Sequence, residues 1–262
     1  MQAATGNKVK INYNIGTLWG KTILKMAISL VFAMLMLFLI FFVFGTMLIF
    51  ESFLLSLIVN LAFLALCMFF FYNMGAGLGE KHAGLSEIVF KRKLNGEQIA
   101  DAQLDQCFRK PKGFLAVGLA VLPFVIVALL FALQTQKQYY QLGALPGWLN
   151  SYRDQTQIGI ALDYYYQDVQ ISSLNVLRLI VRAMNMPFVA IATNLGADVM
   201  LWVERLSPLL LCLIPSCYGL GYLRGEKQRI QVNKAIAINA KRKTILDKQR
   251  KKRKPEEKKQ LI

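Results

Sequence analysis

Two arginines on one face of a short predicted helix form a candidate binding site for an anion. Arg178 and Arg182 are four residues apart, so a helix places them one turn apart on the same side. Their planar guanidinium groups can hold a phosphate, a carboxylate or a lipid head group through forked hydrogen bonds. Asparagines extend this polar stripe, and an aspartate follows it. The candidate ligand or lipid head-group residues are Arg178, Arg182, Asp198, Asn175, Asn185 and Asn194.

The helix that carries this stripe is predicted from about Leu174 to Met186, and its other sides are apolar. Such a helix lies flat in the outer membrane interface, with its arginines among phosphates. The alternative is a helix that stands in a bundle and directs both arginines into a polar cavity. Pro187 is expected to end this helix. The next stretch, Phe188–Val203, is expected to re-enter the membrane or lie on it, because a further span would place the basic C-terminal tail outside.

Motifs for catalysis and for metal or cofactor binding are missing from the sequence. His82 is the single histidine, which is too few for a histidine cluster or an HExxH zinc site. No GxxxxGK[ST], CxxC or GxSxG sequence occurs. Glu97, Asp101 and Asp105 recur every four residues, which predicts a solvated helix face rather than a metal site. An Asp105–Arg109 ion pair is expected on that face. We therefore predict no catalytic residue, no metal and no cofactor.

The C-terminal tail is the second chemically distinctive segment. From Arg224 onward it holds fifteen of the 31 Lys and Arg residues and four Asp or Glu. Such a segment attracts an anionic membrane surface, with about 1 kcal/mol for each cation close to the leaflet. A ribosome or another nucleic acid is the rival partner, because phosphates attract the same charges. The tail up to about Arg250 can extend the last helix into the cytoplasm, although residues 241–254 are too charged to fold alone. The predicted anionic-surface residues are Lys241, Arg242, Lys243, Lys248, Arg250, Lys251, Lys252, Arg253 and Lys254.

Four long stretches without charge predict an all-α, polytopic membrane helical bundle. Each is close to or above the roughly 20 apolar residues that a helix needs to cross a bilayer. We expect four transmembrane helices arranged as two hairpins, with an amphipathic or re-entrant outer helix in addition. The predicted segments are a cytoplasmic arm (1–20), a transmembrane hairpin (21–79), a basic cytoplasmic loop (80–112), transmembrane helix 3 (113–133), an extracytoplasmic or interfacial segment (134–205), transmembrane helix 4 (206–223) and a basic cytoplasmic tail (224–262).

Positive charges decide the predicted orientation. The loop 80–112 and the tail are rich in Lys and Arg, whereas the turn between the first two spans carries only Glu51. The positive-inside rule therefore places both termini in the cytoplasm. The composition, 55% hydrophobic with a net charge of +16, resembles that of small, basic, multi-pass proteins of the bacterial inner (plasma) membrane. The four cysteines lie in predicted spans or in the basic loop, and we expect them to be unpaired.

Two of the predicted spans end in nearly the same residues. Both endings read Tyr-x-x-Gly-x-x-x-Gly-Glu-Lys, 146 residues apart, which suggests two related halves in a 2+2 repeat. Matched endings also place both helix ends at the same membrane face. The repeated residues are Tyr72, Gly75, Gly79, Glu80 and Lys81 in the first ending, and Tyr218, Gly221, Gly225, Glu226 and Lys227 in the second.

Local signals predict where several helices start or bend. Asn95 is expected to cap a helix that begins at Gly96 or Glu97. Ser207 and Pro208 have the pattern of a cap and first residue of the last span. A proline near the middle of the third span, Pro123, is expected to kink it.

The function predicted from these features is that of a non-enzymatic integral membrane protein. It would act as a scaffold or as an accessory subunit of a membrane complex, bound to another membrane protein or to copies of itself. The alternative is a small transporter or lipid-handling protein that uses the outer arginine stripe. Proton- and ion-coupled pumps usually carry ionisable residues inside their spans. The predicted spans bury no Asp, Glu, Lys or Arg apart from Glu51 at the turn, so the first function is favoured.

Overall fold

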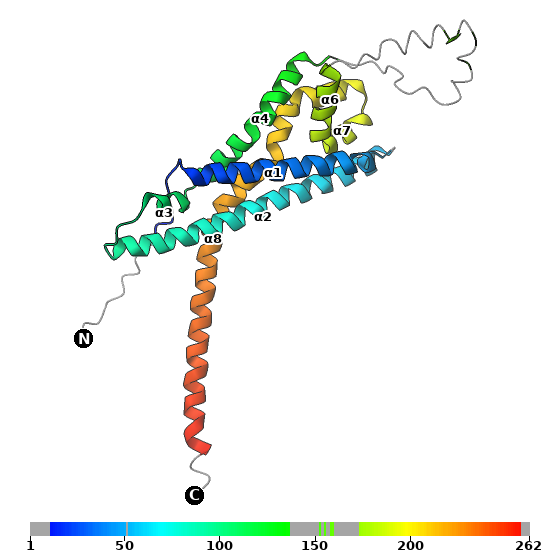
Figure 1. The fold of residues 1–262 in the computed structure, drawn as a ribbon. Coiled ribbons are helices and arrows are strands. Elements are labelled where there is room, and N and C mark those ends of the chain that lie inside the picture. Colours follow the sequence, from blue (N-terminus) through cyan, green and yellow to red (C-terminus); the bar gives the residue numbers. More distant parts are fainter. Residues whose placement is uncertain are drawn as a thin grey trace. The chain divides into compact units, whose positions relative to one another are not determined.

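The computed structural model describes residues 11–50, 52–136, 152, 155, 158–159 and 173–257. These residues are 85% helical, and no strand occurs among them (Figure 1). The predicted all-α class is therefore confirmed. The helices are α1 (Lys21–Phe44), the short 3-10 helix η1 (Gly45–Leu48), α2 (Phe53–Leu94), α3 (Asp101–Gln106), α4 (Lys112–Gln134), α6 (Ser173–Met184), α7 (Met186–Thr193) and α8 (Ala197–Glu257).

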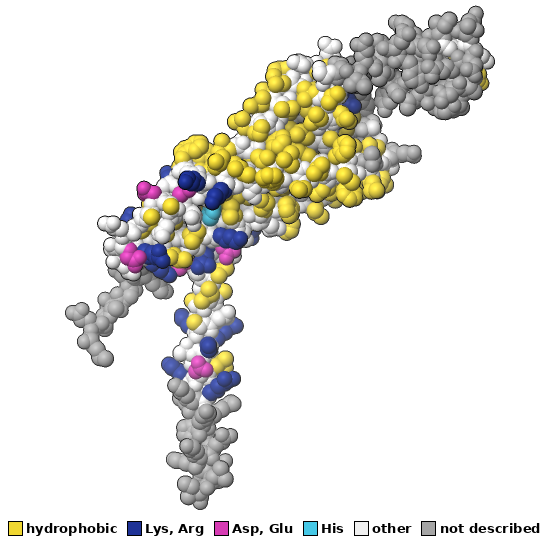
Figure 2. Space-filling model, viewed as in Figure 1, with side chains coloured by type: hydrophobic (Ala, Val, Ile, Leu, Met, Phe, Trp, Pro, Cys, Tyr) yellow, Lys and Arg dark blue, Asp and Glu magenta, His cyan; other side chains and the backbone are white. Residues whose placement is uncertain are grey.

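Four of these helices, α1, α2, α4 and α8, are long and apolar enough to cross a membrane. The number rises to five if the bent pair α6 and α7 counts as one broken span. Large apolar side chains stay exposed along α1, α2 and α4, as at Phe42, Leu54 and Leu133, which suits contact with lipid (Figure 2). These features are those of a multi-pass membrane protein.

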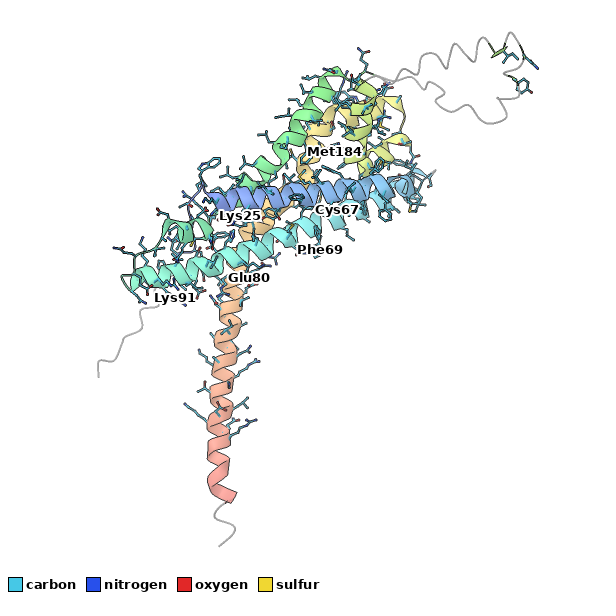
Figure 3. All side chains as sticks on the ribbon, viewed as in Figure 1. Lys25, Cys67, Phe69, Glu80, Lys91 and Met184 are labelled. Carbon is cyan, nitrogen blue, oxygen red and sulfur yellow. The ribbon has the colours of Figure 1, made fainter. Side chains whose placement is uncertain are left out.

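The chain divides into two compact units. Unit 1 consists of Met1–Lys25, Phe71–Ala116 and Cys217–Ile262, and unit 2 of Met26–Phe70 and Val117–Ser216. The helix α2 passes through both units, and its side chains change from apolar, as at Phe69, to charged, as at Glu80 and Lys91 (Figure 3).

Three of the predicted helix boundaries are wrong. The second apolar helix does not end with the predicted hairpin at residue 79 but continues as α2 to Leu94. Asn95 and Gly96 form the turn after it, with Gly96 at φ +80°, and α3 begins only at Asp101 without a side-chain cap. The last apolar helix begins at Ala197, so Ser207 and Pro208 lie inside α8 rather than at its start. Pro123 lies inside α4, as expected.

From Ser173 to the last span, the chain is broken at different residues from those predicted. The first break falls at Asn185, where α6 and α7 meet at a bend of 100°. Pro187 does not end a helix there, because it occupies the first turn of α7, where its missing N–H has no intrahelical acceptor to lose. The stretch Phe188–Val203 is also divided, by Gly196 at φ +100°, into α7 and the start of α8.

The two repeated endings cross one another inside unit 1. A Cβ atom added at Gly75 would collide with the backbone carbonyl of Tyr218, and one added at Gly221 would collide with that of Tyr72. Gly79 and Gly225 face backbone in the same way. Glycines four residues apart on each helix therefore let α2 and α8 approach backbone to backbone, as in small-xxx-small membrane crossings.

The basic tail is not a separate segment in the structure. It forms the end of α8, which runs on to Glu257 (Figure 1). Among the described residues, Asn233 is the last of this helix with a tertiary hydrogen bond, to Glu87 of α2. Every residue from Lys234 to Arg250 is exposed. We call residues 234–250 the rod.

Candidate functional site: two buried ionic clusters

The two arginines of the predicted stripe meet a carboxylate inside unit 2. Arg178 and Arg182 project from α6, Glu204 comes from the third turn of α8, and Thr135 follows the end of α4. The Arg182 guanidinium contacts Glu204 Oε1 through Nη2 at 2.6 Å and through Nε at 2.7 Å. Arg178 Nε lies 3.3 Å from the same oxygen. We call these four residues the arginine–glutamate cluster.

Thr135 completes the cluster from the other side. Its hydroxyl donates to Glu204 Oε2 at 2.5 Å and accepts from Arg178 Nη2 at 3.0 Å. Arg178 Nη2 also donates to the Gln136 carbonyl at 3.1 Å, and its guanidinium lies over the Phe131 ring at 5.8 Å. These contacts tie α6 to α8 and to the end of α4.

Burial differs among the charged members of the cluster. Glu204 is 3% exposed and Arg178 is 5% exposed, whereas the Arg182 side chain is 32% exposed. Two guanidinium groups face one carboxylate, so these side chains carry a net charge of +1, and Arg182 is the member that solvent or a ligand can reach. The cluster contains no nucleophile with an adjacent base, so its chemistry is that of ion pairing.

The remaining candidate residues have other positions. Asn185 is buried at the bend and donates to the Val181 carbonyl of its own helix. Asn194, at the end of α7, donates to the Phe50 carbonyl at 3.1 Å. Asn175 lies in the first turn of α6 and Asp198 in the first turn of α8. The structure thus brings Arg178 and Arg182 together with two residues that the sequence reasoning missed, Glu204 and Thr135.

A signal for Glu204 was present in the sequence. It is the only acidic residue between Asp198 and Glu226, and with Arg205 it interrupts an apolar stretch next to the predicted start of a span. An acid at such a position needs a cation close by. Thr135 gave no comparable signal, because a threonine at a helix end is common.

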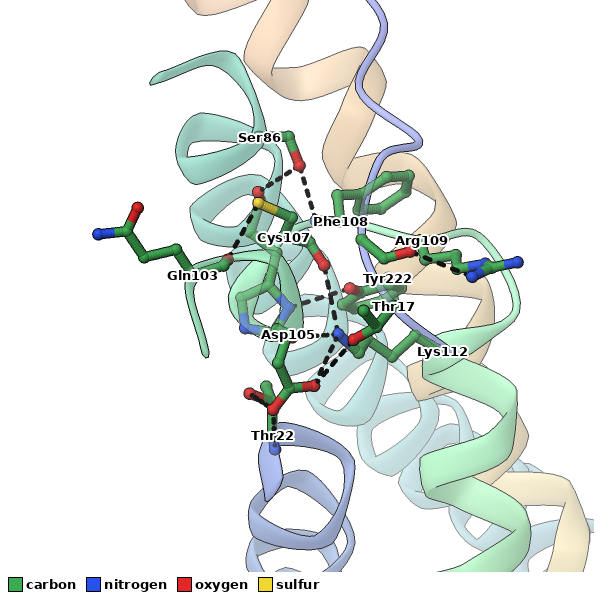
Figure 4. Close-up of polar contacts among 12 residues, drawn as sticks. Thr17, Thr22, Ser86, Gln103, Asp105, Cys107, Phe108, Arg109, Lys112 and Tyr222 are labelled. Carbon is green, nitrogen blue, oxygen red and sulfur yellow. Dashed lines mark hydrogen bonds and ion pairs between the residues drawn. The ribbon is translucent and has the colours of Figure 1, made fainter. Parts of the chain in front are cut away.

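A second buried cluster forms in unit 1 around Lys112, the first residue of α4 (Figure 4). Its side chain is fully buried, and its ammonium group donates to the carbonyls of Asp105 and Cys107. Lys112 Nζ also lies 3.7 Å from Asp105 Oδ1. A buried cation is thus neutralised by one carboxylate and stabilised by backbone oxygens at the C-terminal end of α3.

Asp105 links this cluster to the start of α1. Its Oδ2 accepts from both the N–H and the hydroxyl of Thr22 at 2.9 Å, and its Oδ1 accepts from the Thr17 hydroxyl at 3.3 Å. Burial raises the pKa of Asp105, but the hydrogen bonds from Thr22 and the charge of Lys112 outweigh it and bring the pKa below its ordinary value. The negative charge of Asp105 near the N-terminus of α1 also interacts favourably with the dipole of that helix.

The expected Asp105–Arg109 pair on a solvated face is wrong. Asp105 is engaged by Lys112 and Thr22, and Arg109 donates instead to the Gly16 carbonyl at 3.2 Å. The reason is that α3 ends at Gln106, so the four-residue spacing no longer describes one helix face.

His82, on α2, is also buried in unit 1. Its Nδ1 lies 2.9 Å from the hydroxyl of Tyr222, whose ring stacks on Phe108 with centroids 5.1 Å apart. The Phe108 N–H donates to Ser86 Oγ at 2.7 Å. Cys107 is unpaired and fully buried. The histidine therefore fixes a tyrosine in a packed contact between α2 and α8.

The predicted anionic-surface residues lie on the last turns of α8. Lys241, Arg242, Lys243, Lys248 and Arg250 are exposed on the rod. Lys251, Lys252, Arg253 and Lys254 belong to the same helix, but their side chains lie outside the described part of the structure.

Comparison with models of known protein families, with curated proteins and with solved structures finds no match to this chain. Within the described residues, no group of three or more His, Cys, Asp or Glu side chains is arranged to hold a metal ion.

Proposed function

We propose that this chain is a non-enzymatic integral membrane scaffold or accessory subunit that presents the rod to a cytoplasmic partner. It would cross a bacterial inner membrane four times, as two helical hairpins, with both termini in the cytoplasm. The positive-inside rule supports this orientation, because the loop 80–112 and the tail carry most of the Lys and Arg.

The observation that carries the proposal is that α8 is one continuous helix from the apolar part of the chain into the rod. The rod has no tertiary hydrogen bond of its own among the described residues, whereas Asn233 and Arg229 just before it are held by Glu87. A helix that is anchored at one end and exposed on all sides at the other is suited to binding, since it contributes nothing to a core.

The buried ionic groups hold helices of the same unit together, and this supports a scaffold function. Arg178 and Arg182 contact Glu204, and Lys112 contacts Asp105. Removal of one partner from such a buried pair usually costs about 3–5 kcal/mol. These charges therefore have a structural use that needs no substrate.

The reciprocal crossing of the two repeated endings supports a 2+2 repeat. Gly75 meets Tyr218, and the residues 146 positions away along the chain, Gly221 and Tyr72, meet in the same manner. Two related hairpins that pack through equivalent surfaces give this reciprocity. Such a crossing would hold the start of the rod rigidly against α2.

Extraction in mild detergent followed by mass spectrometry tests the scaffold proposal. The full-length chain is compared with a chain truncated after Asn233, which keeps the last tertiary contact of α8. We expect a stoichiometric partner with the full-length chain, either a protein identified by its peptides or a nucleic acid detected by its ultraviolet absorbance. We expect its loss from the truncated chain, while both chains insert into the membrane. Full-length protein that purifies alone, or a partner that both chains retain equally, would contradict the proposal.

A lipid-handling function is the second candidate, because the arginine–glutamate cluster carries a net positive charge and Arg182 is one-third exposed. An anionic lipid head group would supply the missing negative charge. Native mass spectrometry of R182Q tests this function, with R205Q as control, since Arg205 is exposed on the same helix beside Glu204. Loss of bound phospholipid from R182Q alone would support lipid handling, and equal retention in both variants would exclude it.

A further inference from the structure

We propose that the rod binds the paired phosphate strands of double-helical nucleic acid rather than the membrane surface. This inference rests on the proposed function, because it assigns the class of partner that the scaffold would present. It follows from the stiffness of α8, from the distribution of its charges and from the residue types that it lacks.

The rod cannot fold back onto the leaflet. Residues 226–254 contain neither glycine nor proline, the usual causes of a sharp helix kink, and α8 runs through them without interruption. Lys248 lies 23 residues beyond Gly225, the last glycine of the crossing with α2. At 1.5 Å per residue this is a distance of about 35 Å along the helix. Even with a tilt of about 40°, the upper end of the usual range, Lys248 stands about 27 Å from the end of the span. The leaflet potential decays over a Debye length of about 8 Å.

Cations occupy opposite sides of the rod. Lys234, Lys241 and Lys248 are seven residues apart, so they form one stripe at a helical step of about 100° per residue. Lys243 and Arg250 form a second stripe, turned by about 200° from Lys241 and Lys248. A flat membrane can engage only one of these stripes. A nucleic-acid groove can engage both, because phosphates line its two edges and a major groove about 12 Å wide admits a helix.

The residue types argue against two other partners. Residues 224–262 contain no Phe, Trp or Tyr, so the rod offers no stacking platform for single-stranded bases. Its large exposed apolar residues do not form the continuous stripe by which a helix docks in a protein groove or coiled coil. Those residues are Ile236, Ile238, Ile245 and Leu246. Phosphate contacts from Lys and Arg remain as the main source of affinity.

The test uses the full-length protein in nanodiscs of neutral lipid and a fluorescent short duplex, of DNA in one arm and of RNA in the other. If each of the five stripe cations contacts a phosphate, the logarithm of the affinity should fall with the logarithm of the salt concentration with a slope of about −4.5. Affinity would then fall about 500-fold between about 50 and 200 mM salt. Purified ribosomes serve as a third arm, because their RNA presents the same chemistry. Binding in any one arm identifies the source of the duplex.

Matched variants separate the rod from general positive charge. K241E/K248E and K243E/R250E each reverse one stripe, and each is expected to weaken duplex binding at least tenfold and to reduce the salt slope by about 2. K93E/K110E makes the same charge change at exposed residues outside the rod and is expected to change affinity less than threefold.

Anionic nanodiscs provide the membrane arm of the test. A rod that stands clear of the bilayer keeps its duplex affinity within about threefold when neutral lipid is replaced by anionic lipid, since the leaflet potential is short-ranged. A tenfold loss by competition, binding that depends on one stripe alone, or no duplex binding at low salt would each overturn the inference. If a protein still co-purifies through the rod while no duplex binds, the scaffold proposal stands and only this assignment fails.

Discussion

Substitution of glycine by alanine at the crossing of α2 and α8 gives a stability prediction with an internal control. Gly75 faces the backbone carbonyl of Tyr218, which cannot swing aside as a side chain can, whereas a Cβ atom at Gly77 would meet nothing within 4 Å. Both residues lie in the same helix, two positions apart. Alanine should therefore give the same gain in helix propensity at both positions. The two variants should differ in stability only through the packing of the added methyl group.

The magnitude follows from two terms. Alanine in place of a helical glycine gains about 0.5–1 kcal/mol where there is room. Overpacking of a well-packed contact typically costs about 1–3 kcal/mol. G77A should be as stable as the wild type or slightly more stable, and G75A should lie about 1–3 kcal/mol below G77A. For a chain of this size the difference corresponds to roughly 2–12 °C in apparent melting temperature.

The assay is thermal unfolding in one detergent, followed by the loss of the folded monomer. G221A, at the equivalent place on α8, should behave like G75A because its Cβ atom would collide with the Tyr72 carbonyl. The double variant should lose less stability than the sum, since the first methyl already separates the helices for the second. G75A or G221A melting at or above G77A would refute the close backbone crossing.

Three further predictions concern the ionic clusters and the topology. E204Q should lose about 3–5 kcal/mol in the same unfolding assay, because it leaves buried arginine without its carboxylate, and an unchanged melting curve would contradict that pairing. The pKa of Asp105 is lowered on folding, so its contribution to stability is present above the ordinary aspartate pKa of about 4 and is lost as pH falls through the lower, folded value. The stability difference between wild type and D105N should thus be full at neutral pH and shrink below about pH 4, and a difference independent of pH would sink this reasoning. Reporter fusions at Gln155 and after Ile262 should report opposite sides of the membrane, and the four-span orientation is wrong if they report the same side.

The fold class could be predicted from the sequence, because long apolar runs are compatible with few structures other than membrane helices. A run such as Met26–Phe50 can satisfy its backbone in lipid only as a helix. Helix ends were less accessible, since they depend on tertiary contacts. Glu87 binds Arg229 and Asn233 of α8, so α2 continues well past its apolar part. The local signal of Pro208 was overridden in the same way, because one lost hydrogen bond does not stop a helix that is packed on both sides of it.

Only the arginines of the arginine–glutamate cluster could be predicted from the sequence. The four-residue spacing placed Arg178 and Arg182 on one face of α6, where they are found. The choice of Glu204 rather than Asp198 as the observed carboxylate depends on how α6 packs on α8. That packing follows from the break at Asn185 and from the start of α8 at Ala197, neither of which has a strong local signal.

Photo-crosslinking in living cells tests the scaffold account most directly. A photoreactive residue is placed at Ile238 or Ile245, both exposed on the rod, and at Leu129, which is exposed on the apolar helix α4, as the control. A scaffold that binds its partner through the rod should give a discrete adduct with a macromolecule from both rod positions and no such adduct from Leu129. The absence of any macromolecular adduct from the rod, with lipid labelling intact at Leu129, would contradict the scaffold function.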